Sequence, residues 1–258
     1  MKPSFFLRLN VLLGLGVALS SSSCGDSASP SSADSAAAGD GGQAGSTARF
    51  AVMGNTLYAV DDTSLRTFDL STPQTPVPGP VVSVGVGVET IFPRAPYLFI
   101  GSQQGMFIYN VAGGTPQRVG MYAHAVSCDP VVVADRYAYV TLRLDGACTR
   151  GVNQLDVVDL ANLSQPRLAR SYPMAKPYGL GVDSSLVFVC DQGIKVFDAR
   201  ATPTLRLVQS FPIAATDVIA RRGVLLVTGA DGLYQYRYVA AGSGTLQLLS
   251  RIPVVPVL

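Results

Sequence analysis

The chain has 258 residues, of which 48% are apolar and 14% charged, with one histidine and no tryptophan. Its 19 basic residues include Lys2 and Arg8 of an N-terminal leader, so 17 basic residues face 17 acidic residues in the remainder. This neutral balance provides no basic stripe to meet phosphates, and it excludes nucleic acid as an expected partner.

Residues 1–23 are expected to be a secretory signal peptide. Lys2 and Arg8 supply its positive region, and residues 11–19 form an apolar core that is too short to span a membrane. The small residues that lead to Cys24 resemble the lipobox of bacterial lipoproteins, although Ser21 stands where that motif usually has Leu. The resemblance implies that Cys24 is lipidated and anchors an exported protein at the outer membrane, the cell surface or the periplasm. An ordinary signal peptidase site with an incidental Cys24 is the alternative.

Residues 24–48 are expected to be a disordered tether that begins at the lipidated cysteine. Residues 25–48 contain no large apolar side chain, so they cannot bury enough surface to offset the entropy of ordering. A coil of this length and composition spans about 25–30 Å. The folded domain is therefore expected at residues 49–258.

From residue 49 onward, a unit of about 40 residues recurs five times. The aromatic residue or leucine of its first strong apolar run falls at Tyr58, Phe99, Tyr139, Phe188 and Leu226. Its second strong run closes at Asp69, Asn110, Asp159, Asp198 and Arg237. Side chains of Asp and Asn accept hydrogen bonds from backbone N–H groups two residues on, so this closing position predicts a turn rather than a catalytic set.

Each unit is expected to form four strands, because short runs rich in Val, Leu, Phe and Tyr alternate with Gly, Asp, Asn and Pro. In the fourth unit these runs are 178–183, 186–190, 194–198 and 205–211. The predicted fold class is all-β, a β-propeller of five four-stranded blades. We expect the ring to close by side-chain packing of blade five on blade one, and an open or differently closed β-repeat array is the alternative.

The runs YAYV…LDVVDL, LVFVCDQGIKVFDA and VLLVTGADGLYQYRY resemble the LVIVD-repeat family of bacterial secreted and surface proteins. The resemblance covers nearly all of residues 49–258. It implies propeller blades, display outside the cytoplasm and, by analogy with other propellers, a binding role.

The third unit carries an insertion at residues 144–153, which contains Cys148. The hairpin that turns near residue 135 brings Cys128 back beside the base of this insertion, and an exported protein meets oxidising conditions. We therefore expect a Cys128–Cys148 disulfide, with free cysteines as the alternative. Cys190 lies in an apolar run and is expected to be a buried free thiol.

Aligning the first strands places Glu89, Asp129 and Asp217 near one mouth of the central channel, with Arg143 as a salt-bridge partner or ligand contact. These four are the candidate ligand-binding residues. Carboxylates in such a cluster could bind Ca²⁺ or act as acid and base, whereas solvated strand ends are the simpler interpretation. No other cofactor or metal site is expected, and His124 lacks the spacing of a metal ligand or a Ser-His-Asp triad.

Two functions remain open at this point. The first is a lipid-anchored, non-enzymatic binding or scaffold module of the bacterial cell envelope, whose partner is an envelope or extracellular protein or a glycan. The second is a channel-mouth hydrolase or lactonase, assisted by a metal and built on the acidic cluster. No catalytic residue is assigned, because no catalytic constellation is visible in the sequence.

Overall fold

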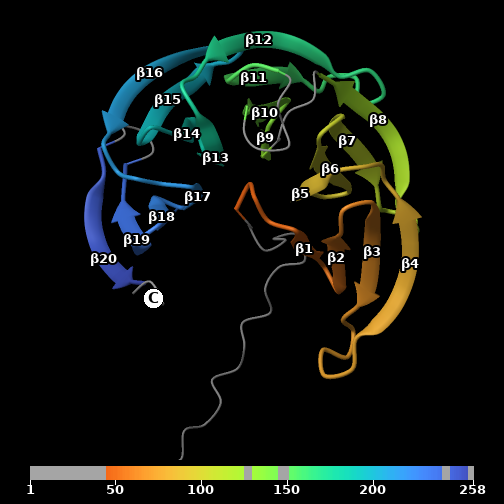
Figure 1. The fold of residues 1–258 in the computed structure, drawn as a ribbon. Coiled ribbons are helices and arrows are strands. Elements are labelled where there is room, and N and C mark those ends of the chain that lie inside the picture. Colours follow the sequence, from red (N-terminus) through yellow and green to blue (C-terminus); the bar gives the residue numbers. More distant parts are fainter. Residues whose placement is uncertain (1–44, 125–129, 145–150, 240–244, 255–258) are drawn as a thin grey trace, which may run out of the picture. The chain divides into compact units, whose positions relative to one another are not determined.

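The computed structural model describes residues 45–124, 130–144, 151–239 and 245–254. Within these segments the fold is all-β, with five four-stranded antiparallel sheets and no helix, and the sheets are the blades of a five-bladed β-propeller (Figure 1). The predicted fold class is confirmed. No helix in the described segments has the length and apolar character needed to cross a membrane.

Strands follow one another in chain order within every blade. Blade one contains β1 (Phe50–Met53), β2 (Thr56–Val60), β3 (Ser64–Asp69) and β4 (Val77–Ser83). Blade two contains β5 (Val88–Arg94), β6 (Tyr97–Ser102), β7 (Gly105–Asn110) and β8 (Gln117–Ala123). Blade three contains β9 (Val131–Ala134), β10 (Tyr137–Leu142), β11 (Gln154–Asp159) and β12 (Arg167–Pro173).

Blade four contains β13 (Pro177–Asp183), β14 (Leu186–Asp191), β15 (Ile194–Ala201) and β16 (Thr204–Phe211), which agrees with the predicted runs to within three residues. Blade five contains β17 (Asp217–Arg221), β18 (Val224–Gly229), β19 (Gly232–Arg237) and β20 (Gln247–Pro253). The first strand of each blade lies towards the centre and the fourth strand forms the outer rim (Figure 1).

Apolar side chains from both faces of the sheets form the core, since blades pack face to face. Among the described residues there are three hydrophobic clusters: one joins blades one and two, one joins blades two, three and four, and one joins blades four and five. None of the three contains residues from both blade five and blade one. The expected closure by packing blade five on blade one is therefore corrected, because the described apolar core stops at both sides of this seam.

A polar segment spans the seam instead. We call residues 45–49 the clasp. Ser46 Oγ donates to Asp217 Oδ1 at 3.0 Å, and Thr47 Oγ1 donates to Asp217 Oδ2 at 2.6 Å, so the clasp is held by the first strand of blade five. Ser46 Oγ also accepts a hydrogen bond from the N–H of Leu180 in β13 at 2.7 Å. The clasp thus binds the inner strands of blades four and five.

The other end of the clasp binds blade two. The N–H of Ile91 in β5 donates to the carbonyl of Ala48 at 2.8 Å, and Arg49 Nη2 donates to the carbonyl of Val88 at 3.1 Å. In Figure 1 the orange segment reaches from β1 towards β13 and β17. Residues 45–48, which the sequence assigned to the tether, therefore contribute to joining the two ends of the ring.

The residues that close the third strands have the predicted structural role. The side chain of Asp69 accepts a hydrogen bond from the N–H of Ser71, and Asp159 accepts one from Ala161. Asn110 bonds the N–H two residues on in the same way, and each of these three bonds starts the turn that leads to the outer strand. Asp198 also bonds the N–H two residues on, but it lies inside β15, which continues to Ala201.

Candidate functional site

One pocket lies where the first strands of blades two and three begin, beside the clasp. It has a volume of about 350 Å³. Its lining residues come from the clasp, the β2–β3 turn, β5, the approach to β9 and the end of β10: Thr47, Arg49, Asp62, Val88, Glu89, Thr90, Pro130 and Arg143. We call this the clasp pocket. It brings two arginines and two carboxyl groups from different blades together.

Glu89 is half-buried in this pocket. Burial raises the pKa of its carboxyl above the ordinary value, and the charge of Asp62 acts in the same direction. The guanidinium groups of Arg143 and Arg49 and a hydrogen bond with Gln103 oppose this effect without cancelling it. Glu89 therefore holds its proton to a higher pH than a solvated glutamate does.

Arg143 is fixed by stacking. Its guanidinium carbon lies 4.3 Å from the centre of the Tyr178 ring, a cation–π contact between blade three and blade four. Lys176 Nζ lies 5.6 Å from the centre of the same ring. Positive charge therefore gathers on this side of the molecule around one aromatic ring, next to the clasp pocket.

Asp217 does not line the clasp pocket, but it contacts Thr47, which does. Its carboxylate accepts hydrogen bonds from both hydroxyl groups of the clasp, and one of these donors, Thr47, lines the pocket. Burial raises the pKa of Asp217, while the bonds from Thr47 and Ser46 act to lower it. The structure thus assigns Asp217 to ring closure, with a link to the pocket through Thr47.

Of the four predicted ligand-binding residues, Glu89 and Arg143 share the clasp pocket and Asp217 contacts one of its walls. Asp129 lies outside the described residues, as do Cys24, Cys128 and Cys148. Within the described segments, no group of three or more His, Cys, Asp and Glu side chains is close enough to hold a metal ion. His124 is half-buried, with its ring centre 5.9 Å from that of Tyr122.

Cys190 is a buried free cysteine, as predicted. It belongs to the hydrophobic cluster between blades four and five, and burial raises the pKa of its thiol. Because the thiolate is the reactive form, this side chain is an inert part of the core.

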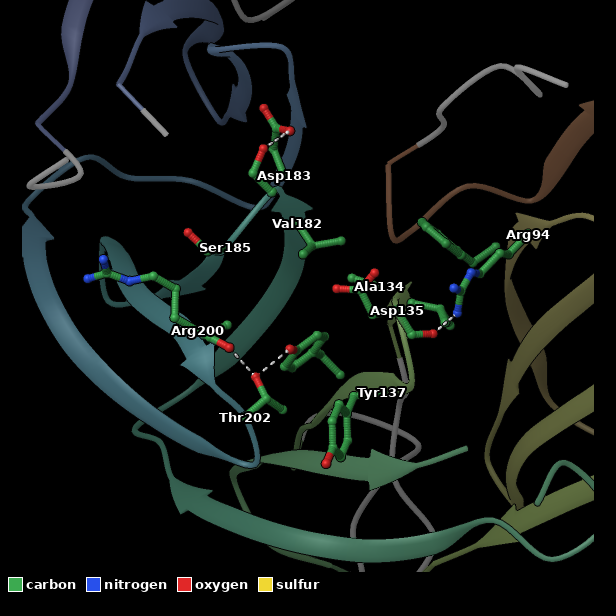
Figure 2. A pocket seen from close by; sticks show the side chains of 14 residues that line it. Arg94, Ala134, Asp135, Tyr137, Val182, Asp183, Ser185, Arg200 and Thr202 are labelled. Atoms are coloured by element: carbon green, nitrogen blue, oxygen red, sulfur yellow. Dashed lines mark hydrogen bonds between the residues drawn. The ribbon is translucent and has the colours of Figure 1, made fainter. Parts of the chain in front are cut away.

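A larger pocket of about 680 Å³ lies at the opposite ends of the same inner strands (Figure 2). The clasp pocket takes Val88–Thr90 from the start of β5, whereas the larger pocket takes Phe92 and Arg94 from its end. We call it the hairpin pocket, because the β9–β10 and β13–β14 turns line it. Its other lining residues are Val133, Ala134, Asp135, Tyr137, Tyr139, Val182, Asp183, Ser184, Ser185, Ala199, Arg200 and Thr202.

The third blade contributes to both pockets, with Arg143 at one end and Tyr137 and Tyr139 at the other. Its strands carry the YAYV and LDVVDL runs. Residues 127–173 match the LVIVD repeat. The LVIVD repeat and the five-bladed fold together support the family that the sequence resembles. A search of curated proteins finds no match to the chain.

Several solved structures resemble this chain in fold. A protein from Lactobacillus plantarum is 13% identical, with a TM-score of 0.63 over 78% of this chain and 69% of that one. A periplasmic gluconolactonase of Pseudomonas aeruginosa, PpgL, is 18% identical, with a TM-score of 0.57 over 78% and 68%. AztD from Citrobacter koseri is 13% identical, with a TM-score of 0.54 over 76% and 58%. At these identities the likeness shows the fold.

Sequence reasoning missed the hairpin pocket. Several of its polar groups lie in turns whose sequence is typical of any loop between two strands. Asp135 and Ser184 are examples, with positive φ angles of 46° and 54° respectively. The one available signal was an aromatic residue directly after the turn, Tyr137 in the LVIVD repeat. The same residue type stands at Tyr97 in blade two, so that signal alone does not distinguish a pocket from packing.

Proposed function

We propose that the chain is a non-enzymatic binding module of the bacterial cell envelope, and that the clasp pocket is its ligand site. The observation that carries this proposal is the convergence of Arg49, Arg143 and the half-buried Glu89 in one concave pocket. Pockets of a few hundred Å³ with a few converging polar groups are typical of small-molecule sites.

The donor set favours a small hydroxylated carboxylate as ligand. The guanidinium groups of Arg49 and Arg143 suit a carboxylate, which accepts two parallel hydrogen bonds from such a fork. Glu89 and Thr47 suit hydroxyl groups, because a carboxyl and a hydroxyl can each accept a hydrogen bond and a hydroxyl can also donate one. Asp217 acts indirectly in this proposal, by holding Thr47.

Calorimetric titration with D-gluconate, and with uncharged glucose for comparison, tests the proposal. We expect gluconate to bind and glucose to bind much more weakly, and Arg143→Ala to weaken gluconate binding by at least about tenfold. Arg118→Ala is the matched control, since Arg118 also stacks on a ring, at 5.1 Å from the centre of Phe107, but lines none of these pockets. Equal affinity of wild type and Arg143→Ala would contradict the proposal.

A lactonase is the second candidate function, favoured by the raised pKa of Glu89 and by the fold likeness to the periplasmic gluconolactonase. Ionised Glu89 would take a proton from water as the water oxygen adds to the lactone carbonyl, and Arg143 would stabilise the resulting oxyanion. Collapse of the oxyanion would break the ring C–O bond, and Glu89 would return its proton to the leaving alkoxide. Proton release from glucono-δ-lactone decides between the two. A rate above the spontaneous one that Glu89→Gln abolishes supports the enzyme, and the spontaneous rate alone supports the binding module.

We further propose that Cys24 is lipidated and that residues 25–44, which precede the clasp, tether the propeller to an envelope membrane. The support is the signal-like leader and the lipobox resemblance in the sequence. The intact mass of the mature protein, extracted from its membrane, should begin at Cys24 and include acyl chains. Cys24→Ser should remove the acyl mass and release the protein from the membrane fraction, because acyl chains would be its anchor. An unchanged membrane fraction would argue against lipidation.

The Cys128–Cys148 disulfide remains a proposal of the same kind. In the chain-entropy picture, a bridge that closes a loop of this length stabilises the fold by about 3 kcal/mol. The mass of the protein should rise by two hydrogens on reduction, and the midpoint of urea unfolding should fall. An unchanged mass under reducing conditions would show free cysteines.

A further inference from the structure

We propose that the hairpin pocket is a second ligand site, and that it binds a short, uncharged oligosaccharide. The clasp pocket and the hairpin pocket lie at opposite ends of the inner strands and share no lining residue. The inference is therefore independent of the function proposed for the clasp pocket, and either one can fail alone.

The size and the floor of the hairpin pocket suit a ligand larger than a single small anion. Its volume of about 680 Å³ lies in the middle of the range of small-molecule sites. Buried Val133, Val182 and Tyr139 form part of the lining, and all three lie on strands of the propeller core. A site whose floor belongs to the core is held rigidly, so little ordering entropy is lost when a ligand binds.

Tyr137 offers an aromatic surface that is already fixed in place. Arg136 lies over its ring, with the guanidinium carbon 5.9 Å from the ring centre. Arg136 is held in turn by Asp159, which accepts a hydrogen bond of 2.8 Å from Nε and a second bond from Nη2. A sugar ring presents an apolar C–H face that packs on an aromatic ring, and a fixed ring of this kind is preorganised for that contact.

Hydrogen-bonding groups surround this aromatic ring. Thr202 Oγ1 lies 3.1 Å from the hydroxyl of Tyr139, which places two hydroxyls side by side in the pocket wall. Across the pocket, Asp183 Oδ2 accepts hydrogen bonds from the N–H of Gly223 and the hydroxyl of Tyr238, so the carboxylate is positioned. Ser185 adds a third hydroxyl. Hydroxyls and carboxylates together match the donor and acceptor pattern of a saccharide.

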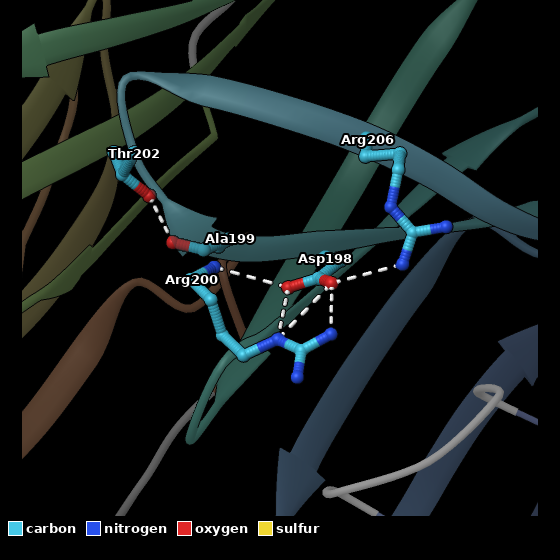
Figure 3. Close-up of polar contacts among 5 residues, drawn as sticks. All are labelled: Asp198, Ala199, Arg200, Thr202 and Arg206. Carbon is cyan, nitrogen blue, oxygen red and sulfur yellow. Dashed lines mark hydrogen bonds and ion pairs between the residues drawn. The ribbon is translucent and has the colours of Figure 1, made fainter.

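The hairpin pocket has no excess of positive charge, which disfavours an anionic ligand. Two of its lining residues are arginines, Arg94 and Arg200, and two are aspartates, Asp135 and Asp183. Arg200 is committed to Asp198, which does not line the pocket and whose carboxylate it bonds through Nε at 3.0 Å and Nη2 at 2.6 Å (Figure 3). Hydrogen bonds from Arg200 hold the pKa of Asp198 well below its usual range, so this pair stays ionised. Arg94 is therefore the one lining arginine left to face two aspartates, and an anionic saccharide is disfavoured.

Calorimetric titration of the full chain with defined oligosaccharides tests the inference. The probes are neutral glucose-, galactose- and N-acetylglucosamine-based tri- to hexasaccharides, and oligogalacturonates of the same lengths are the charged counterparts. We expect at least one neutral series to bind, and Tyr137→Ala to weaken its binding by about tenfold or more through loss of the stacked ring. Tyr97→Ala is the matched control, because Tyr97 begins the second strand of blade two as Tyr137 does in blade three, yet it does not line the hairpin pocket.

Two results would overturn the inference: no binding of any neutral series at millimolar concentration, or binding that Tyr137→Ala and Tyr97→Ala weaken equally. Asp183→Asn provides a second variant. The amide keeps one acceptor oxygen for the N–H of Gly223, but it replaces the other carboxylate oxygen in the pocket lining by a nitrogen. It should reduce saccharide affinity and leave gluconate binding at the clasp pocket unchanged. A loss of both affinities would point to a general structural defect and would also count against a separate site.

Discussion

A buried carboxylate, that of Asp191, holds the loop before β13 against blade four. Asp191 stands at the end of β14 and is 1% exposed. It accepts hydrogen bonds from the N–H groups of Ala175 and Lys176 and from Lys195 Nζ at 2.6 Å. No periodic signal marks such a residue, because its partners come from a loop and from the next strand.

Asp191→Ala should lower the free energy of unfolding by about 3 kcal/mol, because it removes a buried carboxylate and leaves the N–H groups of Ala175 and Lys176 and the Lys195 ammonium without their acceptor. Urea unfolding followed by circular dichroism measures the change. Asp69→Ala is the control, since Asp69 is exposed and its bonds go to Ser71 alone among the described contacts. Similar losses in both variants would contradict the importance of burial.

The same residue predicts a dependence on pH. Burial acts to raise the pKa of Asp191, but the bonds from Lys195 and from the N–H groups of Lys176 and Ala175 outweigh it and lower the pKa below 3.8. A lowered pKa contributes stability that is present above the unfolded value and is lost as pH falls through the folded value. Asp191→Ala should therefore reduce the loss of stability between about pH 4 and the lowered pKa.

At the scale of the strand, each blade has a bulge between its third and fourth strands. The register shifts between Val157 and Val158 in blade three and between Val196 and Phe197 in blade four, with equivalent shifts in the other three blades. A bulge bends a strand and increases its twist, which fits an outer strand that follows the rim of the ring. The period of the apolar residues predicted the strands, but one extra residue in an exposed outer strand leaves no apolar pattern to detect.

The third strand also needs a glycine where the turn is short. Gly193 directly precedes β15 and has a φ of 132°, and a Cβ atom there would lie 2.3 Å from the carbonyl oxygen of Phe211 in the outer strand. Gly193→Ala should lower the free energy of unfolding by about 2 kcal/mol, because both the backbone conformation and the close approach oppose a side chain. Thermal unfolding measures it. Gly113→Ala, where a Cβ atom would meet nothing within 4 Å, should change little, and an equal effect there would contradict this account.

At the scale of the whole molecule, the number and order of blades followed from the repeat spacing, whereas the joining of the ring did not. Residues 45–48 are small and polar, and their composition predicts a coil. They are ordered because Asp217 and Leu180 supply specific partners more than 130 residues away. Such contacts have no local signature. The candidate site shared this limit: Glu89 and Arg143 could be grouped from strand alignment, but Arg49 and Thr47 could not.

Two variants of Asp217 test the clasp. Asp217→Ala removes the acceptor of both clasp hydroxyls and should lower the free energy of unfolding by about 2 kcal/mol. Amide hydrogen exchange should rise first at Leu180 and Ile91, which bond the clasp. If exchange rises uniformly across the blades, the clasp does not act as a separate closing element.

Asp217→Asn separates charge from hydrogen bonding. Because burial raises the pKa of Asp217 above 3.8, the folded chain binds this proton more tightly than the unfolded chain does. Its contribution to stability is greatest below the unfolded value and declines as pH rises through the raised pKa. The neutral amide should remove that decline while it still accepts one hydroxyl, so the two unfolding curves should converge at low pH. A parallel decline in Asp217→Asn would assign the pH dependence to another group.

The position of the clasp also decides where mechanical load enters the fold. Chain continuity means that any pull exerted through the residues before Gly45 reaches Ser46 and Thr47 first, and then the Asp217 carboxylate and the Leu180 N–H that hold them. The antiparallel strand pairs of blade one come later along this path. A stretched chain would therefore release the clasp between the ends of the ring before it strains a blade. The wall of the clasp pocket that Thr47 forms would be lost in the same event.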